Sequence, residues 1–215
     1  MKQYTKKGLY NSYDKKHKER DALDYYSTPS AEVTNILNIL NLDLSNTIIL
    51  EPCCGGGHMY KGIQDYITKD NYPDAIIATD IAERASQYQF PHETGIQYDF
   101  LSDDYKLPIN THIDYIIMNP PYSTIEPFTI RALEIAEKGV LMLGRLQFLE
   151  GKNRYKNILE DNPPTDVYIY IDRIKCYKNG DETDKSSSAQ AYAWFYWNFE
   201  EKNITYPRLH WIYRI

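Results

Sequence analysis

The sequence has few cysteines and no long apolar run. The three cysteines are Cys53, Cys54 and Cys176. An odd number, with two of them adjacent, argues against a disulfide framework and fits a reducing compartment. A zinc site built from these thiols and His58 is disfavoured because the spacing does not match that of zinc ligands. No apolar run approaches the length of a membrane span, and the basic, polar start lacks a signal-peptide core. These absences predict a cytoplasmic protein.

An excess of positive charge is also missing, since the formal net charge is −6. The charge is uneven, however: the first twenty residues carry seven Lys or Arg and two Asp or Glu, a local balance of +5. Local charge, rather than the total, decides contact with phosphates. Two interpretations stay open for residues 1–24: a basic flexible arm that contacts phosphates, and a solvated chain terminus.

The remainder, residues 25–215, is predicted to form one globular domain. Of the 215 residues, 42% are hydrophobic and 25% charged, which suits a single folded core. Strand-like apolar runs alternate with helix-spaced segments, so we expect an α/β fold with a mostly parallel sheet and helices on both faces. The final strands have no helix between them, and the last is a candidate to run antiparallel. The tail, residues 206–215, is one more strand or a cap. The predicted strands are residues 47–50, 75–79, 95–98, 113–118, 140–143, 167–171 and 191–199, and the predicted helices are residues 29–41, 58–67 and 126–137, with a short basic helix from 152.

The strand at residues 113–118 ends abruptly at Asn119-Pro120-Pro121-Tyr122. Two prolines cannot continue a sheet ladder, so the strand stops there. In open α/β sheets, ligands bind at the carboxyl ends of the strands. This turn offers an amide, a carbonyl held by proline and an aromatic face, which together suit the binding of a planar amine.

A second turn follows the strand at residues 47–50. It reads Glu51-Pro52-Cys53-Cys54-Gly55-Gly56-Gly57 and leads into a helix. Glycines let a backbone approach a ligand, and a helix N-terminus carries partial positive charge. No Lys-Ser/Thr follows, so this is not a phosphate-binding loop, and it also lacks the dinucleotide fingerprint. We interpret Cys53 and Cys54 as small packing residues in this turn.

Two other segments have both a structural and a functional interpretation. Thr28 is a good N-cap and Pro29 a good first helical residue. Asp80 ends the second strand, 23 positions after Gly57. A carboxylate at such a strand end commonly accepts hydrogen bonds from two ribose hydroxyls. The structural alternative for Asp80 is a cap of the turn that starts at Ile81.

These segments, in this order, resemble the adenine-specific, amino-group DNA methyltransferases of the class I S-adenosylmethionine-dependent family, in particular the small phage and mobile-element type. The resemblance covers about residues 25–150 and is weaker to 199. It implies a Rossmann-like fold with a seven-stranded sheet and no separate target-recognition domain. It also implies methyl transfer to the exocyclic amine of adenine in DNA by direct in-line attack, with the target base flipped and no metal.

The resemblance implies particular roles for residues of this chain. Asn119, Pro120, Pro121 and Tyr122 are the expected catalytic residues. Asp99 and Phe100 are expected to hold the cofactor adenine, the carboxylate on its amine and the ring on its face. The full set expected to contact the cofactor is Tyr26, Thr28, Pro29, Glu51, Pro52, Cys53, Gly55, Gly57, Asp80, Ile81, Asp99, Phe100 and Asn119.

DNA is the favoured partner, with RNA as the alternative, and the protein is expected to be a monomer or homodimer. Lys152 and Arg154, after Leu149-Glu150-Gly151, are candidates for phosphate contact, and a solvated helix face is the alternative. Arg173, Lys175 and Lys178 lie in residues 172–189, the polar segment that we expect to face the substrate.

Three other functions compete with this hypothesis. The same chemistry acts on RNA adenine or a protein glutamine in related enzymes. A non-catalytic cofactor-binding module is disfavoured because it has no need of Asn119 and Tyr122. A nicotinamide oxidoreductase is disfavoured by Glu51-Pro52 within the loop and by the missing glycine spacing.

Overall fold

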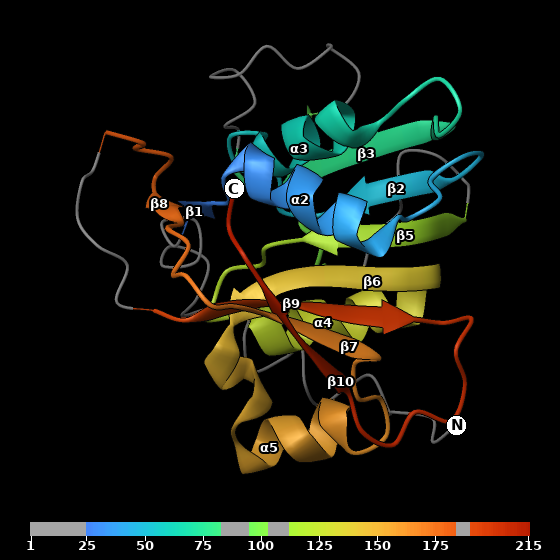
Figure 1. The fold of residues 1–215 in the computed structure, drawn as a ribbon, viewed down its shortest axis with the longest axis vertical. Coiled ribbons are helices and arrows are strands. Elements are labelled where there is room, and N and C mark those ends of the chain that lie inside the picture. Colours follow the sequence, from blue (N-terminus) through green and yellow to red (C-terminus); the bar gives the residue numbers. More distant parts are fainter. Residues whose placement is uncertain (1–24, 83–94, 103–111, 184–189) are drawn as a thin grey trace.

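The computed structural model describes residues 25–82, 95–102, 112–183 and 190–215 (Figure 1). The predicted arm, residues 1–24, and the end of the predicted substrate-facing segment, residues 184–189, lie outside these ranges. Within them, no helix is long and apolar enough to cross a membrane.

A central sheet organises the molecule, and its strand order is β4-β3-β2-β5-β6-β9-β7-β10. All neighbouring strands pair in parallel except β9, which runs antiparallel to both β6 and β7. The prediction of a mostly parallel sheet is therefore confirmed. The bounds are β2 Ile48–Glu51, β3 Ala75–Asp80, β4 Gly95–Gln97, β5 Ile113–Met118, β6 Ala136–Arg145, β7 Asp166–Tyr170, β9 Tyr192–Asn198 and β10 Arg208–Ile212.

Over the described residues, the sheet has one strand more than the seven predicted. The additional strand is β10, which pairs in parallel with β7 at the edge of the sheet. This pairing decides between the two alternatives for the tail in favour of a strand. The strand β6 is also longer than the apolar run at 140–143, because it pairs with β9 over seven consecutive residues, Gly139 to Arg145.

Helices cover both faces of the sheet, as predicted. On one face, α2 (Ser30–Leu40) and α3 (His58–Tyr66) contribute to one core cluster, which includes Ile117 of β5. On the other, α4 (Ile125–Ile135) and the π-helical turn Tyr155–Leu159, after the short α5 (Lys152–Arg154), contribute to a second cluster that includes Met118. Because both faces are covered, all six residues of β5 are buried.

A separate two-stranded sheet was not predicted. Its strands, β1 (Tyr26–Ser27) and β8 (Tyr177–Lys178), pair antiparallel, and the Asn179 N–H donates to the Tyr25 carbonyl at 2.8 Å. Strands of two residues are too short for a periodic pattern, so only the tertiary structure reveals them. The pair ties the segment that follows β7 to the segment that precedes α2.

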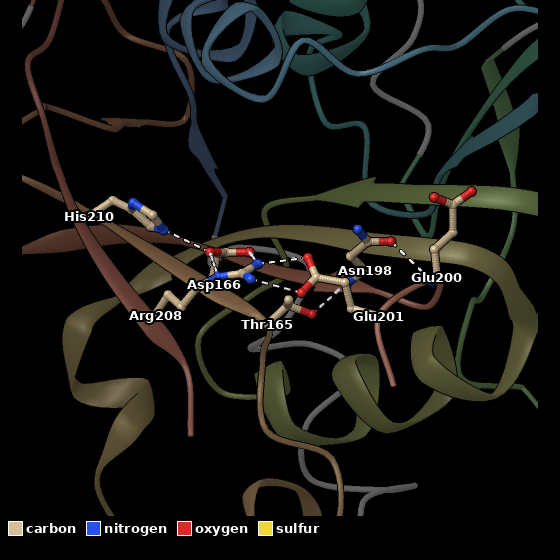
Figure 2. Close-up of polar contacts among 7 residues, drawn as sticks. All are labelled: Thr165, Asp166, Asn198, Glu200, Glu201, Arg208 and His210. Carbon is tan, nitrogen blue, oxygen red and sulfur yellow. Dashed lines mark hydrogen bonds and ion pairs between the residues drawn. The ribbon is translucent and has the colours of Figure 1, made fainter. Parts of the chain in front are cut away.

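Strand β10 is anchored to β7 by a charged cluster centred on Asp166 (Figure 2). The Asp166 carboxylate accepts hydrogen bonds from Nε and Nη2 of Arg208 and from Nε2 of His210, each at 2.7 Å. Arg208 also pairs with Glu201 at 2.7 Å. Burial opposes ionisation of Asp166, but the hydrogen bonds from Arg208 and His210 outweigh it and hold the pKa of Asp166 below its ordinary value.

We expect Asp166→Asn to lower the free energy of unfolding by about 1–3 kcal/mol, because it leaves the Arg208 donors poorly paired beside a buried amide. The stabilisation in the unsubstituted protein is fully present above the ordinary aspartate pKa of 3.8. It is lost as the pH falls through the lower folded-state value. Urea denaturation at pH 7 and at pH 3 measures both effects, with Glu200→Gln, an exposed carboxylate in the same view, as the control (Figure 2). Equal stability of Asp166→Asn and the unsubstituted protein at pH 7 would contradict the anchoring role.

Candidate active site

The glycine turn and Asp80 meet at the carboxyl ends of the neighbouring strands β2 and β3. Gly55 and Gly57 have φ of +51° and +81°, in the left-handed region that favours glycine. The Gly55 N–H donates to Oδ2 of Asp80 at 2.8 Å, and the Ala82 N–H donates to Oδ1 at 2.8 Å. Asp80 therefore caps the turn at residues 80–82, and it also holds the glycine turn. Each carboxylate oxygen keeps a second lone pair for a ligand hydroxyl.

Glu51 is a buried acid at the base of this turn. Its side chain is 2% exposed, and Oε2 has no hydrogen-bond partner within the described part of the chain. Burial, followed by the negative charge of Asp80, raises the pKa of Glu51 well above its ordinary value. An acceptor left without a partner in this position is suited to an ammonium group, whose positive charge would lower the pKa of Glu51 again.

Tyr25 covers the glycine turn and was not among the predicted site residues. A Cβ on Gly55 would lie 2.1 Å from Cε2 of Tyr25, so no larger residue fits there while Tyr25 holds this position. The Tyr25 hydroxyl accepts from the Gly56 N–H at 2.8 Å and lies 3.2 Å from Nδ1 of His58. Only its place next to Tyr26 in the sequence could have indicated this contact.

The side chain of Asn119, at the end of β5, is held in a defined orientation. Its Nδ2 donates to the Tyr26 carbonyl at 2.9 Å and to Oγ1 of Thr28 at 3.0 Å. Because the amide has two N–H groups and both are used, Oδ1 is left as the acceptor. Burial raises the pKa of the Cys53 thiol, and the nearby backbone N–H of Asn119 partly offsets this rise, so the Asn-Pro-Pro-Tyr turn lies close to the glycine turn.

The helix-capping interpretation of Thr28 and Pro29 is wrong. Helix α2 begins at Ser30, with Pro29 at the N-cap position and no capping hydrogen bond from a side chain. The physical reason is that the Thr28 hydroxyl accepts from Asn119 instead. Thr28 therefore contacts the predicted catalytic amide directly.

Tyr122 lies in an aromatic cluster beside Asn119. Its hydroxyl is 2.6 Å from that of Tyr192, its ring centroid is 5.5 Å from that of Tyr26, and the Arg145 guanidinium lies over its ring at 3.9 Å. Burial, followed by the neighbouring Cys176 and Tyr192, raises the pKa of Tyr122. Tyr122 is therefore neutral and half-buried.

Asp99 and Phe100 differ from each other in accessibility. Asp99 is half-buried, and its Oδ1 accepts from the Leu101 N–H at 3.0 Å. The Phe100 ring is 1% exposed and packs against Phe128 at 5.1 Å between centroids. The burial of Phe100 favours a packing role over the expected contact with the cofactor ring, because its neighbours in the core already cover it.

The remaining predicted positions differ in their surroundings. Pro52 is buried, while Ile81 is 39% exposed at the edge of the turn after β3. Among the described residues, no group of three or more His, Cys, Asp or Glu side chains is arranged to hold a metal ion.

The basic residues proposed for phosphate contact have diverse partners. Nη1 of Arg154 donates to the carbonyls of Gln147, Phe148 and Glu150 at 2.9, 3.1 and 2.7 Å, which favours a structural role. Lys152, Arg173 and Lys178 are exposed. The Lys175 ammonium lies 5.3 Å from the centre of the Tyr177 ring.

The predicted substrate-facing segment reaches the glycine turn. Strand β8 pairs with β1, whose Tyr26 carbonyl binds Asn119, and Glu182 lies 3.3 Å from Nε2 of His58 at the start of α3. Residues 172–183 therefore lie beside the candidate site, although sequence separation alone does not place them there.

No family model and no curated protein matches the sequence. Solved structures share the fold. A structure described as a class I S-adenosylmethionine-dependent methyltransferase from Listeria monocytogenes has a TM-score of 0.62 at 13% identity, over 88% of this chain and 67% of that one. The type I restriction-modification methyltransferase subunit from Streptococcus thermophilus has a TM-score of 0.63 at 13% identity, over 87% and 47%.

A proposed RNA methyltransferase from Pyrococcus horikoshii has a TM-score of 0.56 at 16% identity, over 82% of this chain and 87% of that one. The chain spans about half the length of the restriction-modification subunit that it matches. The fold is therefore the Rossmann-like fold of class I methyltransferases, confirmed independently of any sequence similarity.

Proposed function

We propose that this protein transfers a methyl group from S-adenosylmethionine to the exocyclic amine of adenine in DNA. The observation that carries the proposal is the orientation of Asn119. Its Nδ2 donates to Tyr26 and Thr28, which leaves Oδ1 as the acceptor that we assign to a ligand amine at the end of β5. A carbonyl held by proline, that of Pro120, follows it directly in the chain.

The residues at the ends of β2 and β3 fit the proposed cofactor. Glu51 offers a buried acceptor for the amino group of its methionine part, and Gly55 and Gly57 keep the backbone free of Cβ atoms there. Asp80 offers acceptors for the two ribose hydroxyls, and Asp99 an acceptor for the adenine amine. When bound, the cofactor would supply an electrophilic methyl group on its sulfonium: the S–CH3 bond would break as the N–CH3 bond forms, S-adenosylhomocysteine would leave, and the methylated amine would lose one proton.

The protein's part in the chemistry is to hold and activate the amine. The amine of adenine is a weak nucleophile because its lone pair is delocalised into the ring. Acceptance of its two N–H groups by Oδ1 of Asn119 and the Pro120 carbonyl draws the nitrogen towards tetrahedral geometry and frees the lone pair. Binding in a fixed position adds the gain in rate that comes from proximity.

A base within a duplex cannot reach this turn, so the target base has to leave the stack. Unstacking costs a few kcal/mol. Stacking on the neutral ring of Tyr122 offsets roughly 1–3 kcal/mol of that cost. The fold similarity to a restriction-modification subunit and the exposed Lys152, Arg173 and Lys178 support DNA as the substrate. The similarity to a proposed RNA methyltransferase keeps RNA as the second candidate.

Transfer of labelled methyl from S-adenosylmethionine tests the proposal. Unmethylated duplex DNA, single-stranded DNA, RNA and cell protein are offered in parallel, and label in DNA recovered as methylated adenine is the expected result. Label in RNA or in glutamine of protein would keep the chemistry and replace the substrate. Bound cofactor without any transfer would favour the non-catalytic module.

Thr28 is expected to tune the reaction through Asn119. We expect Thr28→Val to lower kcat about tenfold, equivalent to about 1.4 kcal/mol, because one of the two bonds that orient the Asn119 amide is lost. Single-turnover methyl transfer measures the effect.

Ser27→Ala is the matched control for Thr28→Val. The adjacent Ser27 hydroxyl is also buried, but it has no hydrogen-bond partner within the described residues, so its removal should leave the rate unchanged. The same rate in Thr28→Val as in Ser27→Ala would show that Thr28 does not orient the amide.

A further inference from the structure

Arg145 occupies one face of the Tyr122 ring. Arg145 is the last residue of β6, which pairs in parallel with β5. Its side chain therefore starts at the carboxyl ends of the strands, as the Asn-Pro-Pro-Tyr turn does. Its guanidinium carbon is 3.9 Å from the ring centre. A guanidinium is planar and stacks on aromatic faces, much as a nucleobase does.

The positive charge of Arg145 has no counterion in the described part of the chain. No ion pair with a carboxylate is formed there, and Nε is buried without a hydrogen-bond partner. The Tyr122 ring lies under the guanidinium, and Tyr192 and Cys176 are near enough for its charge to act on them. All three groups are neutral at physiological pH. Burial raises the pKa of Tyr192 and the pKa of Cys176 to about 12, even though the charge of Arg145 acts to lower both.

Within the described part of the chain this half-buried cation faces neutral groups, so its charge is available to pair with an anionic ligand. Arg145 forms its stacking contact with the ring that the proposed function assigns to the target base. Two planar groups cannot share one ring face. If the target base takes the face that the guanidinium covers, the guanidinium has to move, and the phosphodiesters that flank the base are anions with which it can pair.

We propose that Arg145 is a substrate-positioning residue that exchanges Tyr122 for a backbone phosphate of the substrate strand when the target base enters. The inference rests on the proposed function. Stacking of the cation on Tyr122 is worth about 0.5–2 kcal/mol, which is close to the roughly 1–3 kcal/mol for a base on an aromatic ring. The exchange on Tyr122 is therefore nearly balanced, and the new ion pair with phosphate favours the bound arrangement.

The salt dependence of DNA binding tests this role. The affinity of each protein for an unmethylated duplex is measured over a range of NaCl concentrations, with S-adenosylhomocysteine present. We expect Arg145→Ala to bind about tenfold more weakly at low salt and to reduce the slope of log K against log [NaCl] by about 1, as loss of one phosphate contact requires. KM for DNA should rise more than kcat falls.

Two variants and one control make the result specific. Arg145→Lys should restore the slope, because an ammonium still pairs with phosphate. Arg145→Gln should behave like Arg145→Ala while it keeps a planar group over Tyr122, and it replaces Arg145→Ala if that variant does not fold. The control is Lys69→Ala. Lys69 is exposed in the connection from α3 to the amino end of β3, away from the carboxyl ends of the strands, so its removal should leave the slope unchanged.

The outcomes separate this inference from the proposed function. If the unsubstituted protein methylates DNA and the slope is the same in Arg145→Ala and Arg145→Gln, Arg145 does not bind phosphate and the inference is overturned alone. If the unsubstituted protein neither binds nor methylates DNA, the proposed function and the inference are overturned together.

Discussion

Asn119→Ala is expected to lower the rate of methyl transfer by about 10³-fold or more while leaving cofactor affinity nearly intact. The substitution removes Oδ1, one of the two acceptors proposed for the target amine. Loss of a single preorganised polar group of this kind typically costs 10²–10³-fold in kcat. The loss here should lie at the upper end, because the Nδ2 bonds to Tyr26 and Thr28, which pin the turn, disappear as well.

Two measurements separate chemistry from binding in this variant. Single-turnover methyl transfer gives the rate of the chemical step, and calorimetry gives the dissociation constant for S-adenosylhomocysteine. Asn38→Ala is the matched control: Asn38 is exposed on α2, and its Nδ2 donates to the Thr34 carbonyl of the same helix. Full activity of Asn119→Ala would refute the assigned chemistry, whatever the substrate.

Asp80→Ala should instead weaken cofactor binding by about 30–100-fold, equivalent to about 2–3 kcal/mol. Hydrogen bonds to a charged group contribute about 1.5–3 kcal/mol. The variant loses the proposed contacts to the ribose hydroxyls. It also loses the acceptor that holds the Gly55 N–H and so loosens the glycine turn. At saturating cofactor, the rate of methyl transfer should recover most of its original value.

Calorimetric titration with S-adenosylhomocysteine measures the change. Asp74→Ala provides the control, because Asp74 is an exposed aspartate next to the opposite end of the same strand. If Asp80→Ala binds the cofactor as tightly as Asp74→Ala does, Asp80 serves only as the cap of the turn at residues 80–82.

Much of the fold follows from local sequence patterns. The run at residues 113–118 forms β5 with the predicted bounds, because an apolar strand that ends at two prolines has one stopping point. The helix and strand around the glycine turn also lie within one residue of their predicted ends. The order of these elements is typical of the class I fold, and the structural similarities bear that fold out.

Predictions about short or context-dependent elements were less accurate. Residues 206–215 carried no decisive pattern, and β10 forms because Asp166 pairs with Arg208 and His210 across 42 and 44 positions of sequence. The two-residue strands β1 and β8 depend on each other and have no local signature. In both cases the deciding interaction joins residues that are remote in the chain.

The sequence by itself determined which residues stand at the carboxyl ends of β2, β3 and β5, since local hydrophobic runs and turn residues set where each strand stops. Only the tertiary structure decided how the side chains there are used. Thr28 has the local pattern of a helix cap, yet its hydroxyl binds Asn119, 91 positions away. Arg145 has no distinguishing local pattern, yet it covers Tyr122. Contacts of this kind depend on which strand ends lie side by side in the sheet, and that arrangement is a property of the whole chain.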